Sequence, residues 1–338
     1  MQSNHFSTYD LAKSRQLDAW REWYAYSYEV SPLDAGESGF AAESEVWKLN
    51  GVGFARISAP PLRAARTKLL TRRDPTDHVC LTIGRRAVTG MTFGSDCKEV
   101  PAGSPFVFAL DGAHVSERDA DERLQLYIAR DRFPEAMPAL DAARGGTVST
   151  SLGALLAEYF NILRLTLPTL RDEEAQRLPS AIVAMVVACV APSADRMAMA
   201  SGPLDATRKD KVRRFILRNL YSPNLGPDLM SKELGISRSN LYRLLESEGG
   251  VANYIKSHRL WESLTQLSDP RNTKPVAEIA EALGLADSSG FSRAFRKQFG
   301  ASPTEVREAV RTGSTSALAH PRSELAQGES FRGFLRTL

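Results

Sequence analysis

Residues 275–303 read PVAEIAEALGLADSSGFSRAFRKQFGASP, and this stretch decides the fold of the C-terminal third of the chain. Its pattern predicts a short helix, a tight turn opened by Gly284, and a second helix. The apolar positions recur at helical spacing in both halves. They are Ile279, Ala280 and Leu283 in the first helix, and Phe291, Ala294, Phe295 and Phe299 in the second.

The opposite face of the second predicted helix is rich in hydroxyls and cations. It carries Ser288, Ser289, Ser292, Arg293, Arg296 and Lys297. Such side chains can reach base edges and phosphates. A helix–turn–helix unit places its second helix in the major groove of DNA. The stretch therefore predicts a DNA-binding helix–turn–helix.

The same pattern occurs upstream, where residues 229–248 read LMSKELGISRSNLYRLLESE. Gly235 matches Gly284, and Arg243 matches Arg293, which indicates a duplicated unit. Between the copies, residues 251–267 read VANYIKSHRLWESLTQL and predict a linker helix. At a rise of ~1.5 Å per residue this helix is about 25 Å long. That is somewhat less than one duplex turn of ~34 Å, so two recognition helices can enter successive major grooves.

Two such units joined by a helix, with the signature FSRAFRKQFGASP at 291–303, resemble the AraC/XylS transcription regulators. The firm resemblance covers residues 208–311. The chain departs from the usual family pattern at three places: Leu245 stands in place of a Phe, Ser263 in place of an Ala, and Leu285 and Ala286 in place of a commoner Gly-Phe-x turn. The resemblance implies an all-α C-terminal domain, residues 208–311, that binds double-stranded DNA, with RNA polymerase as a further candidate partner.

Named contact residues follow from this resemblance. Base contacts are expected from Ser239, Tyr242 and Arg243 upstream, and from Ser288, Ser289, Ser292 and Arg293 downstream. Phosphate contacts are expected from Arg238, Arg296 and Lys297. The alternative, that Arg243 and Arg293 are solvated or pair with acids such as Glu246, stays open. Their equivalent positions in two repeats favour DNA contact.

Charge is unevenly distributed along the 338 residues. Residues 205–312 hold 18 Lys+Arg and 13 Asp+Glu, whereas residues 1–204 hold 22 and 25. The basic excess therefore coincides with the predicted DNA-binding part, as phosphate binding requires. Three cysteines without CxxC spacing predict free thiols and a cytoplasmic protein. The longest apolar run, residues 181–191, is too short to span a bilayer.

The N-terminal part, residues 1–148, alternates short apolar runs with turn signals. The runs between residues 44 and 130 are VGFARIS, HVCLTIG, AVTGMTF, PFVFAL and LQLYIA. They predict antiparallel β structure, after an aromatic-sided helix within residues 8–30. Arg66 and Pro101-Ala102-Gly103 resemble the cupin-like effector-binding domain of the same family. The expected fold class is thus α+β, with flanking helices on an N-terminal β domain.

Three further segments complete the predicted organisation. Residues 149–192 predict a helical pair, which either packs inside its domain or forms the homodimer interface often found there in the resembled family. Residues 193–207, rich in Ser, Ala, Gly and Pro, predict a linker. Residues 312–338 predict a mostly disordered tail, in which Phe331, Phe334, Leu335 and Leu338 have helical spacing but a frayed end is expected.

No enzymatic motif stands out in the sequence. The N-terminal half offers only His5, His78 and His114, without a His-x-His pair, so neither a metal site nor another cofactor is expected. The sequence predicts a DNA-binding transcription regulator that senses a small molecule of unknown identity. A ligand-independent regulator, whose β domain serves assembly only, and a cupin-type enzyme with a DNA-binding domain are the alternatives.

Overall fold

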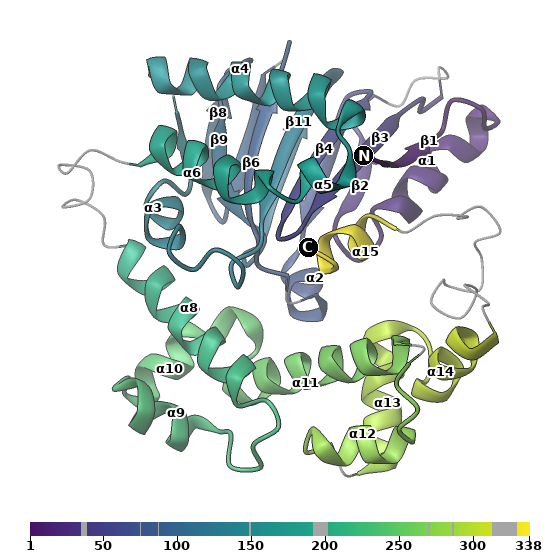
Figure 1. Cartoon of the computed structure of the whole chain (residues 1–338), viewed down its shortest axis with the longest axis vertical. Coiled ribbons are helices and arrows are strands. Elements are labelled where there is room, and N and C mark those ends of the chain that lie inside the picture. Colours follow the sequence, from purple (N-terminus) through teal and green to yellow (C-terminus); the bar gives the residue numbers. More distant parts are fainter. Residues whose placement is uncertain are drawn as a thin grey trace. The chain divides into compact units, whose positions relative to one another are not determined.

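The computed structural model describes residues 1–34, 39–74, 76–86, 88–148, 150–191, 202–269, 271–285, 287–312 and 330–338. The chain forms two compact units, and the second interrupts the first in sequence. Unit 1 consists of Met1–Thr207 and Ala326–Leu338, and unit 2 of Arg208–Leu325 (Figure 1). The fold class is α+β, with β structure in unit 1 and helices in unit 2, as predicted.

Unit 1 is built on two antiparallel sheets. The seven-stranded sheet has the order β1-β3-β4-β11-β6-β9-β12, and the five-stranded sheet the order β2-β5-β10-β7-β8. The strands are β1 Asn4–Ser7, β2 Glu29–Pro32, β3 Glu43–Leu49, β4 Val52–Ala59, β5 Leu62–Arg66, β6 Val79–Gly84, β7 Thr89–Phe93, β8 Asp96–Val100, β9 Phe106–Ala109, β10 His114–Arg118, β11 Asp121–Ile128 and β12 Gly146–Thr147.

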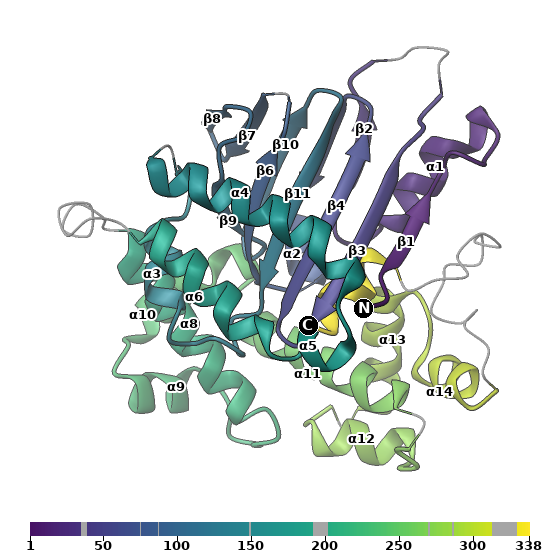
Figure 2. The same cartoon turned by 45° about the horizontal axis from the view of Figure 1, so that its top comes forward.

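Helices cover the outer face of the seven-stranded sheet, as Figure 2 shows for α4 and α6. The helices of unit 1 are α1 Lys13–Trp23, α2 Lys68–Arg73, α3 Met137–Ala142, α4 Ser151–Thr166, α5 Asp172–Ala175, α6 Leu178–Val190 and α15 Phe331–Arg336, with a 3-10 turn at Leu167–Thr169. Leu156 and Phe160 of α4 and Ile182 and Val186 of α6 join the core on this face.

Strand β11 contributes side chains to two hydrophobic cores, one on each face of its sheet. Its side chains alternate between the two faces of the sheet. Leu124 and Leu126 belong to the core beneath the helices, whereas Tyr127 belongs to the core between the sheets. Gln125 and Arg123 share the side of Tyr127, so the interior between the sheets contains polar groups as well as aromatic rings.

The structure differs from the predicted N-terminal boundaries. The helix expected within residues 8–30 ends at Trp23, and Glu29–Pro32 form strand β2. Strand β10, HVSER, was not predicted, because its buried positions His114 and Ser116 are polar and the strand therefore lacks an inward apolar pattern. Arg66 is fully buried and donates hydrogen bonds to the carbonyl oxygens of Leu110, Ser27, Asp74 and Thr76.

The last residues of the chain correct the expectation of a mostly disordered tail. Residues 313–329 of that predicted tail lie outside the described residues, but α15 is a formed helix of unit 1. Its Phe331, Phe334 and Leu335 are fully buried in the core between the sheets. A helix with i, i+3, i+4 apolar spacing is ordered when a complementary surface receives it. Here the rings of Tyr24 and Tyr127 lie against Phe331.

The regular elements in the described part of unit 2 are helices, and the first of them begins before Arg208. They are α8 Gly202–Arg218, α9 Pro227–Leu234, α10 Arg238–Leu244, α11 Val251–Ser268, α12 Val276–Ala282, α13 Ser288–Phe299 and α14 Pro303–Thr312, with a 3-10 turn at Glu246–Glu248. One core joins them, and α11 contributes Leu260, Leu264 and Leu267 to it. Residues 193–201 of the predicted linker lie outside the described residues, and residues 202–207 form the start of α8.

Candidate nucleic-acid interface

Helices α9 and α10 form the first helix–turn–helix. Gly235 ends α9 with a φ of 65°, a left-handed conformation that glycine adopts without strain. Ser237 then caps α10, since its side chain accepts a hydrogen bond from the backbone N–H of Asn240 at 3.3 Å. Leu241 and Leu245 are fully buried, which sets the opposite face of α10 toward solvent.

Helices α12 and α13 repeat this arrangement. Gly284 has a φ of 65°, and Asp287 caps α13 by accepting a hydrogen bond from the N–H of Gly290 at 3.0 Å. Phe291, Phe295 and Phe299 pack inward, with the rings of Phe295 and Phe299 4.6 Å apart. The internal match between the two sequence repeats is therefore a match between two local structures.

All of the residues predicted to contact DNA are exposed. They are Arg238, Ser239, Tyr242 and Arg243 on α10, and Ser288, Ser289, Ser292, Arg293, Arg296 and Lys297 on α13. Ser239 and Arg243 of α10, and Ser289, Arg293 and Lys297 of α13, lie on the side of the helix opposite to the buried apolar residues, whereas Arg238 and Ser288 are the first residues of their helices. Tyr242 exposes 52% of its surface, although an aromatic ring of this size is usually more buried.

Some of these residues form ion pairs or hydrogen bonds with acidic side chains. Arg238 forms an ion pair with Asp228, and Arg296 Nη2 lies 2.8 Å from Glu305 Oε1. Ser289 Oγ donates a hydrogen bond to Asp287 Oδ1 at 2.9 Å. Because both ion pairs are exposed, they contribute little to stability.

Arg259 of α11 has a structural role that the sequence analysis did not identify. Its Nε and Nη2 atoms donate to the carbonyl oxygens of Leu220 and Ser222, at 3.1 and 2.8 Å. A Cβ atom at Gly284 would lie 2.8 Å from its Nη1 atom. Arg259 therefore fixes the segment that follows α8, and its guanidinium lies close to Gly284, whose positive φ favours glycine.

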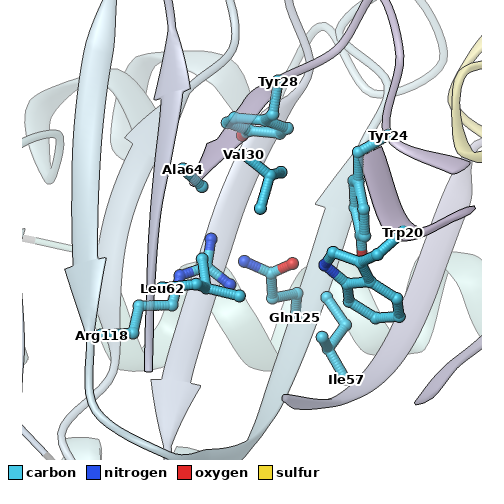
Figure 3. A pocket seen from close by; sticks show the side chains of 9 residues that line it. All are labelled: Trp20, Tyr24, Tyr28, Val30, Ile57, Leu62, Ala64, Arg118 and Gln125. Atoms are coloured by element: carbon cyan, nitrogen blue, oxygen red, sulfur yellow. The ribbon is translucent and has the colours of Figure 1, made fainter. Parts of the chain in front are cut away.

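A second candidate site lies in unit 1, between the two sheets. It is a small pocket with a cavity volume of about 10 Å³, which is room for about one water molecule. Figure 3 shows the side chains that line it: Trp20, Tyr24, Tyr28, Val30, Ile57, Leu62, Ala64, Arg118 and Gln125. No effector-binding residue was predicted from the sequence, because these positions come from helix α1, the segment between α1 and β2, and five strands that are distant in sequence.

The histidines of unit 1 have partners other than a metal. His78 Nε2 lies 2.7 Å from the carbonyl oxygen of Leu335, and His114 Nε2 lies 3.3 Å from the Tyr28 hydroxyl. Burial lowers the pKa of His114 to about 4. Among the described residues, no group of His, Cys, Asp and Glu has the arrangement of a metal site. The three cysteines carry free thiols, as predicted.

None of the described helices combines the length and the apolar composition needed to cross a membrane.

Comparison with known proteins agrees with the geometry of unit 2. Residues 230–309 match a family model described as a helix-turn-helix domain. SoxS of Escherichia coli (strain K12), a regulatory protein, is 31% identical over 85 residues, which are 25% of this chain and 78% of SoxS. The transcriptional activator NphR of Rhodococcus sp is 26% identical over 220 residues, 62% of each protein.

The similarity extends to unit 1 in one solved structure. The AraC-like transcriptional activator CuxR has 27% sequence identity and a TM-score of 0.56, and the match covers 78% of this chain and 95% of CuxR. The chain spans smaller parts of other relatives, 34% of the Msm operon regulatory protein of Streptococcus mutans and 62% of NphR. With its paired helix–turn–helix units and its N-terminal β domain, the chain belongs to the AraC/XylS family of transcription regulators.

Proposed function

We propose that this protein regulates transcription by reading a specific DNA sequence with α10 and α13, under the control of a small molecule bound in unit 1. The observation that carries the DNA-binding proposal is the pair of capped, exposed helices with equivalent polar faces. Membership of the family supports DNA binding in general, and the exposed side chains of the two helices are the candidate contact residues.

Arg243 and Arg293 are the proposed centres of base reading. Each lies one helical turn after a serine, Ser239 or Ser289, so each helix offers a guanidinium and a hydroxyl to one groove. Tyr242, Ser288 and Ser292 extend these two faces. Arg238, Arg296 and Lys297 supply the phosphate contacts that hold the helices in register, since such contacts position without specifying sequence.

Single alanine substitutions test these roles. With a site selected from random DNA, Arg243→Ala and Arg293→Ala should each weaken specific binding by about 1–3 kcal/mol. They should weaken binding to random DNA much less, because the phosphate contacts remain. Lys297→Ala is the matched control on α13, and should weaken both kinds of binding similarly. Equal losses on both DNAs for the two arginines would assign them to phosphate or structural contacts.

Unit 1 is the proposed sensor. The pocket between its sheets combines aromatic walls with two polar side chains, Arg118 and Gln125, which is the usual composition of a ligand site. A ligand that controls DNA binding must bind the DNA-competent and incompetent states with different affinity. Thermal shift with a metabolite panel, followed by DNA-binding assays with each stabilising compound, tests this. A ligand-independent regulator would show neither effect.

A homodimer is the proposed assembly, with α4 at its interface. The structure separates the two helices that the sequence considered together. Ile182, Val183 and Val186 of α6 are buried against the sheet, whereas α4 exposes Leu152, Leu155, Ile162 and Leu165. These four leucine and isoleucine side chains are 46–63% exposed on one face of α4. An exposed apolar stripe of this kind is typical of a protein interface.

A further inference from the structure

One side of helix α11 contacts both helix–turn–helix motifs. Arg259, Glu262 and Gln266 fall at helical spacing within Val251–Ser268, so their side chains share that side. Residues 219–226, which join α8 to α9 and which we call the entry segment, form hydrogen bonds with it. The turn of the second motif, at Gly284, lies against it as well. Helix α11 is therefore the common support of the two motifs.

The guanidinium of Arg259 reaches both motifs at once. Its Nε and Nη2 atoms donate to the carbonyl oxygens of Leu220 and Ser222, at 3.1 and 2.8 Å. Its Nη1 atom borders Gly284, where an added Cβ atom would come within 2.8 Å of it. Burial lowers the pKa of Arg259, in keeping with a guanidinium partly removed from water. Its fork of N–H donors can hold two carbonyls and still border a third backbone segment, which a single ammonium group does not match.

A second contact holds the same entry segment. The Tyr221 hydroxyl donates to Glu262 Oε1 at 2.6 Å and accepts a hydrogen bond from Gln266 Nε2 at 2.7 Å. The Tyr221 side chain is about half exposed, so water competes for these hydrogen bonds. The entry segment is thus fixed to α11 through its backbone by Arg259 and, more weakly, through one side chain.

The first motif is also attached to α11 at its other end. The 3-10 turn after α10 ends at Glu248, whose carbonyl oxygen accepts a hydrogen bond from Asn253 Nδ2 at 2.7 Å. Lys209 Nζ of α8 lies 2.9 Å from Glu248 Oε1. Helices α9 and α10 are therefore held to α11 both before and after the motif in sequence, and Arg259 supplies the attachment that also borders the second motif.

We infer that Arg259 is a positioning residue for DNA reading, which fixes α10 and α13 at one separation and thereby sets the spacing of the two half-sites. The inference rests on the proposed function, in which these two helices read the DNA sequence. One inserted base pair moves a half-site by about 3.4 Å and turns it by about 35° around the duplex. A rigid pair of reading helices cannot follow this displacement. Without the Arg259 contacts the entry segment is free to shift along α11, so the first motif can follow it.

The spacing preference of the full chain tests this inference. In a site selected from random DNA, each half-site is the set of positions at which Arg243→Ala or Arg293→Ala loses discrimination. Fluorescence anisotropy gives the affinity for this site and for shifted sites with one base pair inserted or removed between the half-sites. The ratio of the two affinities is the shift penalty. We expect a shift penalty of about tenfold or more for the wild type, because a displaced half-site loses base contacts.

A conservative variant isolates the role of the guanidinium. Arg259→Lys keeps the positive charge but loses the fork that holds two carbonyls. We expect it to bind the selected site about three- to tenfold more weakly, and its shift penalty to fall below about threefold. Lys256→Gln is the matched control, because Lys256 is an exposed cation of the same helix. It should keep the shift penalty of the wild type.

A role in stability alone predicts a different result. It would lower the affinity of Arg259→Lys for all of these sites by one factor, and an unchanged shift penalty therefore overturns the inference. Circular dichroism shows whether the variant is folded at the assay temperature. If it is not, Tyr221→Phe replaces it, since this change removes only the weaker contact of the entry segment. Its shift penalty should fall by about twofold, and an unchanged penalty would contradict the inference.

The wild type separates this inference from the proposed function. If it binds its selected site specifically but tolerates the inserted base pair as well as Arg259→Lys does, the positioning role fails and the proposed DNA reading stands. If the wild type prefers no sequence over random DNA, the proposed function itself fails, and the positioning role fails with it.

Discussion

At the scale of single residues, one buried histidine of the DNA-binding unit makes the stability of that unit depend on pH. His258 of α11 is buried in the core of unit 2, its ring 4.6 Å from that of Tyr254. Its Nε2 atom has no hydrogen-bond partner among the described residues. Burial, with a further contribution from the cation of Arg213, lowers the pKa of His258 to about 3. The folded state therefore holds this imidazole neutral.

The consequence is a loss of stability in mild acid. Below pH ~6.5 the unfolded chain binds a proton at this histidine that the folded chain rejects down to a pKa of about 3. Unfolding free energy should thus fall as pH decreases through this window, by about 2 kcal/mol at pH 5. Urea unfolding of residues 205–312, where His258 is the only histidine, measures this. His258→Gln should reduce the slope; an unchanged slope would assign it to carboxylates.

At the scale of elements, α15 is a part of unit 1 that follows the DNA-binding unit in the sequence. Its ring contacts reach Tyr24, which also lines the pocket, and the Phe331–Tyr24 centroids are 4.6 Å apart. Gly53 of β4 makes room for it, because a Cβ there would lie 2.6 Å from Phe334 Cζ. A close approach of this kind indicates that the helix and the sheet are fitted to each other.

Removing the apolar side chains of α15 should therefore destabilise unit 1. Phe334→Ala empties a fully buried position and should cost about 3–5 kcal/mol of unfolding free energy. Thr337→Ala, at the residue that ends this helix, is the milder control, since it removes an exposed hydroxyl and its hydrogen bonds to Gly333, Phe334 and Lys48. Thermal unfolding followed by tyrosine and tryptophan signals distinguishes the two. Equal, small effects would mean that α15 is dispensable to the core.

The exposed stripe on α4 makes a separate prediction about assembly. Leu155→Glu places a charge on a face that we propose is buried between two chains. The substitution should convert the dimer to a monomer, measured by sedimentation velocity at a protein concentration on the order of tens of micromolar. Leu69→Glu, at an equally exposed leucine of α2, is the matched control and should not change the size. A wild-type chain that is already monomeric at that concentration would refute the α4 interface.

At the scale of the molecule, unit 2 has a core of its own. The apolar cluster that joins its helices runs from Val212 to Val306, without a residue of unit 1. We expect residues 205–312 to fold and bind DNA alone, with log affinity falling linearly with log salt as counterions leave the phosphates. Fluorescence anisotropy measures this DNA affinity at salt concentrations from about 50 to about 200 mM, where such losses are large. A folded fragment without salt-dependent binding would contradict the prediction.

Local sequence determined most of unit 2. Gly284, the inward phenylalanines of α13 and the hydroxyl-rich opposite face lie within a few helical turns of one another, so their spacing alone predicted the motif and its candidate contacts. The departures at Leu245 and Ser263 also fit, because both residues are fully buried and Ser263 satisfies its hydroxyl by donating to the carbonyl oxygen of Leu260 at 2.7 Å.

Tertiary structure decided unit 1. The sequence indicated antiparallel strands, but the strand order, the inward row of Arg118, Arg123 and Gln125, and the docking of α15 depend on contacts between residues far apart in the chain. Phe331 and Phe334 have the same helical spacing whether they are frayed or buried, and only the aromatic surface that receives them distinguishes the two states. Periodicity determines which residues share a face; the partner of that face comes from the fold.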